Sequence, residues 1–162
     1  MVVVDSSALI PLAWVGRLDL VTDAFDDLRT TEMVREEVLV TGKPGTIALE
    51  SFLEDVSVEE TPPDAERVAE VEGIAAADAS VILLADTPNE VLLANDKGLI
   101  EVARIHGVEC WWVTTLLLKC AKDGDVTSDE ATDVLYDLVD EGMNLHPRVY
   151  VRVQRRLQEF GD

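Results

Sequence analysis

Residues 1–12, MVVVDSSALIPL, place three valines, an acid and two serines before an apolar, helix-like run. A strand as apolar as Val2–Val4 is covered on both faces, which is typical of parallel sheets in α/β proteins. In such folds ligands bind in the crevice beyond the carboxyl ends of the strands. Asp5 stands at the end of this strand. Asp5 therefore takes part in chemistry at that edge, or else Asp5 or Ser6 simply caps the next helix.

The rest of the chain continues the alternation of strands and helices and predicts an α/β fold. Further strands are predicted at 56–60, 90–95 and 109–113, after the first strand at 2–5. Helices are predicted over 7–15, 17–28, 30–40, 46–56, 64–73, 75–85, 97–107, 114–123, 125–142 and 147–160. Thr31 is a plausible helix cap, Gly107 ends a helix, and Pro147 occupies a first helical turn.

The chain suits one domain over residues 1–162, because its length allows a sizeable core and no repeat or linker interrupts it. Residues 126–162 or so form a helical C-terminal extension. Thr127 and Glu130 have the spacing of a capping box in its first helix. The apolar stripe of that helix consists of Ala131, Val134, Leu135 and Leu138.

Charge is the unusual feature of the composition. Thirteen basic residues, only four of them lysines, face thirty-three acidic ones, for a net charge of −20. An acid-rich, lysine-poor chain resembles proteins of salt-loving archaea, where a Debye length of about 3 Å at molar salt screens self-repulsion. The chain has no apolar membrane span and no signal-peptide pattern, so we expect a cytoplasmic protein with Cys110 and Cys120 reduced in the core.

Four acids stand at element ends or on otherwise apolar helices: Asp5, Glu37, Asp78 and Asp96. Burying unpaired acids costs several kcal/mol, so their grouping makes sense if they converge on cations. Hard ions such as Mg²⁺ or Mn²⁺ prefer oxygen ligands, and such clusters activate water against a phosphodiester. Each acid also has a plainer interpretation: Glu37 is solvated beside Glu36, and the three aspartates cap helices.

Taken in order, these acids resemble the pattern of the PIN-domain family of metal-dependent nucleases, which includes VapC-type toxins. The four matching stretches are VVVDSSALI for Asp5, MVREEVL for Glu37, AAADASVILLA for Asp78 and LLANDKGLIEVARIHGVE for Asp96. The closing EGMNLHPRVYVRVQRRL resembles an elongated subgroup with two extra C-terminal helices. The resemblance implies a three-layer α/β/α sandwich around a parallel sheet, with these four acids as catalytic metal ligands at its carboxyl edge.

The chain departs from the family pattern in two places. Ala94 replaces the Thr or Ser usual two residues before the fourth acid, and Asp78 stands where the elongated subgroup often has Glu. The resemblance leaves Glu36 and Glu37 open as the second ligand, and we favour Glu37. Supporting roles near the site are predicted for Ser6, Asn95, Thr114 and Thr115.

Other enzyme classes that place an acid after the first strand do not match. A haloacid-dehalogenase phosphatase needs a second acid two residues later, where this chain has Ser7. A receiver domain needs paired acids, and phosphate-binding glycine loops are absent. The resemblance thus implies a Mg²⁺- or Mn²⁺-dependent ribonuclease, with the toxin of a toxin–antitoxin pair, a homodimer and a small antitoxin partner as its finer implications. The alternative is a non-catalytic PIN-fold module that binds nucleic acid or protein.

Arginines cluster in the last helix and indicate where nucleic acid could bind. Arg148, Arg152, Arg155 and Arg156 lie opposite its apolar side chains, although such a face can simply be solvated and paired with neighbouring acids. Trp111 and Trp112 could stack on bases, but in a strand one of them should face the core.

Overall fold

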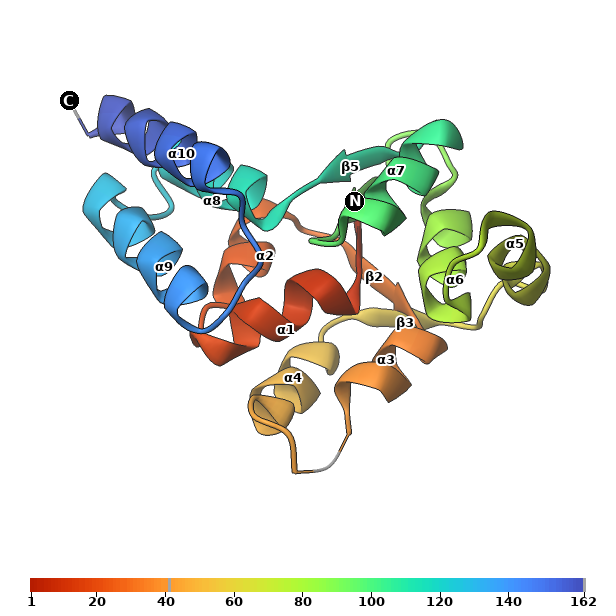
Figure 1. Ribbon diagram of the computed structural model, residues 1–162. Coiled ribbons are helices and arrows are strands. Elements are labelled where there is room, and N and C mark those ends of the chain that lie inside the picture. Colours follow the sequence, from red (N-terminus) through yellow and green to blue (C-terminus); the bar gives the residue numbers. More distant parts are fainter. Residues whose placement is uncertain (41, 162) are drawn as a thin grey trace.

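The computed structural model describes residues 1–40 and 42–161 and contains a single parallel sheet of five strands (Figure 1). The strands are β1 (Val2–Val4), β2 (Leu28–Thr31), β3 (Ser57–Glu59), β4 (Val91–Leu93) and β5 (Glu109–Trp111). Their order is β3-β2-β1-β4-β5, so β1 occupies the centre. All three β1 valines are fully buried, as expected for a strand covered on both faces.

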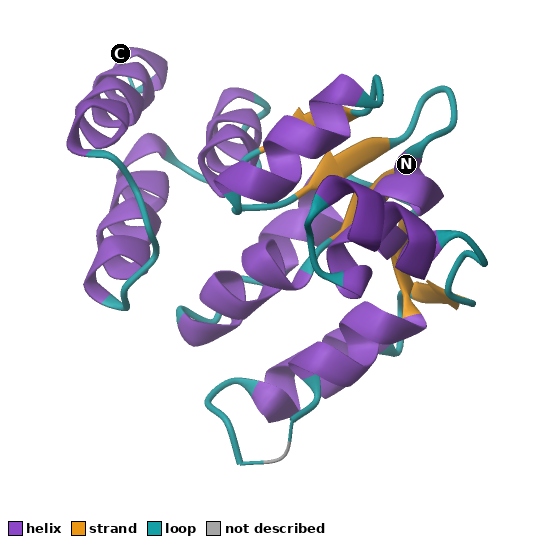
Figure 2. Ribbon diagram, turned by 45° about the vertical axis from the view of Figure 1, so that its right-hand side comes forward, coloured by secondary structure: helices purple, strands orange, loops and turns teal. Residues whose placement is uncertain are grey.

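Helices flank this sheet, and Figure 2 shows the strands enclosed among them. Those of the described residues are α1 (Ser6–Trp14), α2 (Asp19–Ala24), α3 (Glu32–Val38), α4 (Thr46–Leu53), α5 (Ala65–Glu72), α6 (Ala76–Ala85), α7 (Lys97–Ile105), α8 (Val113–Lys122), α9 (Ser128–Asp140) and α10 (Pro147–Phe160). The predicted α/β fold with a parallel sheet and two additional C-terminal helices is confirmed. Gly107 follows α7 with a φ of 81°, a conformation that favours glycine.

The prediction of a helix over residues 17–28 is wrong. Helix α2 ends at Ala24, and the chain enters the sheet at Leu28 to form β2 between β1 and β3. The Thr30 hydroxyl donates to the Val4 carbonyl at 2.7 Å, which ties β2 to the end of β1. Thr31 ends the strand and also caps α3, its hydroxyl accepting from the Val34 N–H at 3.3 Å. This short strand is stabilised by its neighbours rather than by any local alternation.

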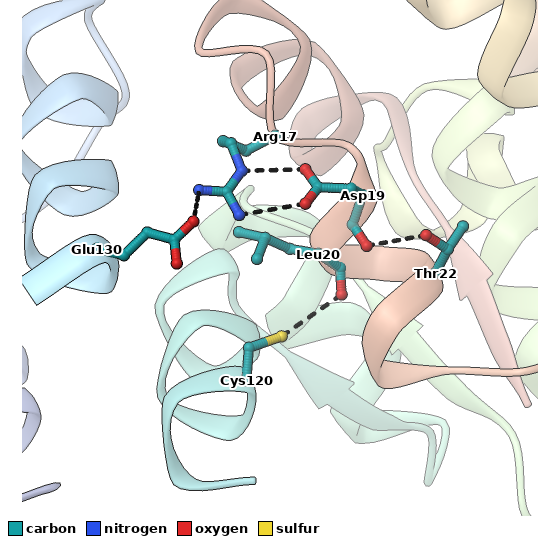
Figure 3. A network of polar contacts seen from close by, with 6 residues as sticks. All are labelled: Arg17, Asp19, Leu20, Thr22, Cys120 and Glu130. Carbon is teal, nitrogen blue, oxygen red and sulfur yellow. Dashed lines mark hydrogen bonds and ion pairs between the residues drawn. The ribbon is translucent and has the colours of Figure 1, made fainter. Parts of the chain in front are cut away.

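The C-terminal extension packs against the rest of the domain through α8 and α1 (Figure 1). Its capping box is half formed: Thr127 accepts from the Glu130 N–H at 3.1 Å, whereas the Glu130 carboxylate accepts from Arg17. Arg17 also donates two hydrogen bonds to the Asp19 carboxylate, of 3.0 and 3.1 Å (Figure 3). Arg17 therefore fastens α9 to the start of α2.

Both cysteines are free thiols. Cys120 is buried, and its Sγ lies 3.5 Å from the Leu20 carbonyl oxygen (Figure 3). Burial raises the pKa of Cys120 to about 12, so the thiol stays protonated and unreactive. Among the described residues, no helix combines the length and the apolarity that a bilayer span requires.

Candidate metal centre

Asp5 lies at the carboxyl end of the central strand with only 1% of its surface exposed. Its N–H donates to the Leu93 carbonyl of β4 at 3.0 Å. Its Oδ2 caps α1, accepting from the Ser7 N–H at 3.1 Å and from the Ser7 hydroxyl at 2.6 Å. Burial raises the pKa of Asp5 to about 6; the Ser7 hydrogen bonds oppose this rise, and the Glu37 charge adds to it.

The second carboxylate oxygen of Asp5 has no partner. Among the described residues, Oδ1 of Asp5 and Oε2 of Glu90 are the buried carboxylate oxygens without a hydrogen bond. Glu90 lies before β4, and its other oxygen accepts from Arg29 at 2.7 Å, so a cation balances its charge. The recorded donors to Asp5, by contrast, are neutral. Helix capping therefore accounts for only one of the two Asp5 oxygens.

Glu37 and Asp78 are carried by two helices that hydroxyl groups hold together. The Thr31 and Ser80 hydroxyls lie 2.8 Å apart, and Ser80 also donates to the Ala77 carbonyl at 2.6 Å. This contact joins the start of α3 to α6. Glu37 is exposed near the end of α3, and Asp78 is half-buried in the first turn of α6. Asp78 is not the N-cap of its helix, because Ala75 holds that position.

Asp96 is the N-cap of α7, and its Oδ1 accepts from the Leu99 N–H at 3.1 Å. The side chain is exposed. The capping interpretation therefore describes a contact that Asp96 makes. A capping carboxylate keeps a second oxygen and further lone pairs for another ligand.

The four acids act on one another electrostatically. The pKa of Asp78 is raised to about 7, first by burial and then by the charges of the other three acids, Asp5, Asp96 and Glu37. As they stand, however, no three His, Cys, Asp or Glu side chains within residues 1–40 and 42–161 are grouped closely enough to hold a metal ion. Mutual repulsion among like charges favours such a spread arrangement.

Ser7 links two strand ends beside the acids. Its hydroxyl donates to Asp5 and accepts from the Asn95 N–H at 2.8 Å, so it bridges β1 to the residue before Asp96. The supporting contact thus comes from Ser7, which sequence reasoning passed over in favour of the buried Ser6. The signal for it was its place two residues after a capping Asp, the usual position of the capped N–H.

The predicted threonines lie in the first turn of α8. Thr114 is buried and, together with Asn95, lines a cleft of about 660 Å³. Thr115 is half-buried and is not part of the cleft wall. Thr114 and Asn95 therefore share the cleft wall, and Thr115 lies outside it.

The raised pKa of Asp78 predicts a pH-dependent stability of the metal-free protein. From pH about 4 to about 7, the folded chain keeps a proton that the unfolded chain has released. The contribution of Asp78 to the free energy of unfolding is therefore fully present below pH about 4 and is lost as the pH rises through about 7. Urea unfolding in EDTA should therefore show that wild type loses more stability over this range than Asp78→Asn. Parallel stability curves for the two proteins would contradict the prediction.

Comparisons with known proteins show the family of this chain. A family model described as a PIN domain matches residues 1–159. The chain belongs to the PIN-domain family. The crystal structure of PAE2754 from Pyrobaculum aerophilum is similar to this PIN domain, with 25% sequence identity and a TM-score of 0.54. The match covers 74% of this chain and 94% of that one. No curated protein matches the sequence.

In this PIN domain, three of the four predicted α10 arginines line one groove. Arg148, Arg152 and Arg155 line a shallow groove of about 420 Å³. Arg156 points elsewhere: it donates to Glu159 at 2.6 Å, and its guanidinium lies 5.1 Å from the centre of the Phe160 ring. Arg156 follows Arg152 by one turn on the same side of the helix, but it does not line the groove. Nucleic-acid binding by the four arginines stays a prediction.

The two neighbouring tryptophans of the PIN domain have different surroundings. Trp111 packs on Phe25, with ring centres 5.1 Å apart. Trp112 follows β5, forms the N-cap of α8 and lines the cleft with Asn95 and Thr114. Trp112 is therefore the tryptophan available to a ligand in the cleft, as strand alternation requires for one of the two.

Proposed function

We propose that this PIN domain is an endoribonuclease dependent on Mg²⁺ or Mn²⁺. The proposed metal ligands are Asp5, Glu37, Asp78 and Asp96. The observation that carries the proposal is the Asp5 carboxylate, which is buried at the carboxyl end of the central strand with one oxygen unpartnered. A carboxylate in this position is costly unless a cation compensates it. Three further acids beside it supply the oxygen ligands that hard cations prefer.

The protein groups have separate roles in this proposal. Ser7 occupies one oxygen of Asp5 and leaves Oδ1 available. Asp96 is held at the start of α7 by its capping bond, whereas the exposed Glu37 keeps its rotamer freedom. Bound divalent ions supply a water of lowered pKa and neutralise charge that develops on the phosphodiester. Binding must draw the carboxylates closer than they lie here, and the attraction of the cation offsets their repulsion.

A second candidate function is a non-catalytic PIN-fold module that binds nucleic acid or protein. Two observations favour it: Asp5 and Asp96 both make helix-capping bonds, and no three acids of the described part of the chain are grouped for a metal. The two candidates differ in their dependence on metal. A scaffold module has no need of divalent ions, whereas four neighbouring carboxylates in a nuclease should bind them.

Calorimetric titration with Mn²⁺ and a cleavage assay on single-stranded RNA test the proposal together. We expect saturable Mn²⁺ binding, cleavage in Mn²⁺ or Mg²⁺, loss of cleavage in EDTA and recovery when the metal is restored. Metal binding without cleavage of any RNA would support the scaffold module with a structural ion. Absence of Mn²⁺ binding would contradict the metal centre itself.

The resemblance to VapC-type toxins extends the proposal to a toxin–antitoxin pair, with a homodimer and a small antitoxin protein as partner. The neighbouring reading frames test this extension. A short frame directly upstream whose product binds this PIN domain would support a toxin, and its absence would favour an RNA-processing enzyme.

A further inference from the structure

The cleft of about 660 Å³ lies between the starts of α7 and α8 and the C-terminal extension. One wall comes from the starts of α7 and α8, through Asn95, Lys97, Trp112 and Thr114. The opposite wall comes from the segment that leads into α10 and from Arg152 on that helix. The two walls lie far apart in the sequence, and the contact of α10 with α8 brings them together (Figure 1).

The cleft opens beside the acids. Asn95 lines it and is bonded through its N–H to Ser7, whose hydroxyl is bonded to Asp5. Asp96 is the next residue in the chain, and Lys97 after it lines the cleft again. A ligand in the cleft would therefore lie beside Asp5 and Asp96, two of the proposed metal ligands.

The extension adds positive charge to the cleft through Arg152. Arg152 lines both the cleft and the shallow groove that contains Arg148 and Arg155. The three arginines have i, i+4 and i+7 spacing and share one face of α10; we call them the arginine stripe. None of them forms an ion pair with an acid of the described residues, although the chain has thirty-three acids.

We propose that the cleft and the arginine stripe bind the single-stranded RNA substrate, which rests on the function proposed above. Phosphates would lie along the stripe and at Lys97, whose exposed pair with Glu101 is long at 3.9 Å and therefore weak. One base would stack on Trp112, and Asn95 and Thr114 would offer hydrogen bonds beside it.

An unpaired strand fits these features better than a duplex does. A base can stack on an aromatic face that lines a cleft only when it is free of its own stack and pairing. The carboxylate side chains of an acidic peptide would match the arginines but offer no flat ring to Trp112. The C-terminal extension is thus assigned a direct part in substrate binding.

Fluorescence anisotropy in EDTA tests the stripe without cleavage, using a labelled single-stranded RNA of about twelve nucleotides. The test variant is Arg148→Gln/Arg152→Gln, and the control is Arg67→Gln/Arg104→Gln, which removes equal charge from exposed positions on α5 and α7. We expect the test variant to bind about tenfold more weakly at low salt and to lose about 1.4 from the slope of log affinity against log salt. The control should retain most of the affinity.

Trp112 is tested in the same assay. Trp112→Leu should weaken binding about fivefold or more, and Trp112→Phe should restore much of it, because stacking needs a ring face. Circular dichroism on each variant reports whether the fold is kept. Equal affinity of the Leu and Phe variants, or of the test and control double variants, would overturn the proposal.

Further outcomes separate this proposal from the nuclease function. RNA bound through the stripe without any cleavage would support the cleft and contradict catalysis. If Arg148→Gln/Arg152→Gln cleaves RNA with the KM of the wild type, the nuclease function would be retained and the proposed role of the cleft would be overturned. Tighter binding of duplex RNA than of the single strand, or displacement of RNA by an equal concentration of polyglutamate, would overturn the assignment of the occupant.

Discussion

Replacing Asp5 with Asn is expected to abolish RNA cleavage and to weaken Mn²⁺ binding by about a hundredfold or more, beyond the effect of losing a group that only orients a ligand. Asn caps helices about as well as Asp, so the bond from the Ser7 N–H should persist. The substitution removes one buried charge and leaves the size of the side chain almost unchanged. The metal-free variant should therefore be more stable than wild type, because burial and the Glu37 charge both disfavour ionised Asp5.

The matched control is Asp64→Asn. Asp64 is also a helix N-cap and also carries one negative charge, but it is exposed before α5 and makes no side-chain capping bond. Calorimetry with Mn²⁺, cleavage assays and melts in EDTA on both variants separate a local role from a change in net charge. Unaltered Mn²⁺ binding in Asp5→Asn would remove the active-site assignment and most of the case for a nuclease.

Raising KCl from about 0.1 M to about 1 M is expected to increase the melting temperature by about 10 °C, the shift that a few kcal/mol produces in a domain of this size. The net charge is −20 from thirty-three acids and thirteen bases, and ion pairs with Lys or Arg engage only eight acidic side chains in the described part of the chain. Most carboxylates thus repel one another unless ions screen them. We propose on this basis that the protein is adapted to a salt-rich solution.

Sucrose at the same osmolality provides the control for this salt effect. Sucrose stabilises folded proteins through exclusion from the surface and leaves charges unscreened, so it should raise the melting temperature less than KCl does. An unchanged or lower melting temperature in KCl would contradict adaptation to salt.

The sequence by itself determined the features that depend on near neighbours. The all-apolar Val2–Val4 predicts a strand buried on both faces, and Thr31 and Gly107 mark the start of one helix and the end of another. The positions of the four acids at element ends are visible in the same way. Each of these signals is local, because a cap, a stop or a buried strand is set within a few residues.

Tertiary structure decided what depends on residues far apart in the chain. Strand β2 lies within a stretch of helix-like pattern, and pairing with β1 and β3 makes it a strand. The carboxylate of Glu130 turns to Arg17, 113 positions away, instead of completing its capping box. Ser7 reaches Asn95 across 88 positions, and α10 brings Arg152 to the cleft beside Trp112. Each such contact closes a long loop, and the interactions of the whole fold offset the entropy that the closure costs. No local sequence pattern therefore encodes these contacts.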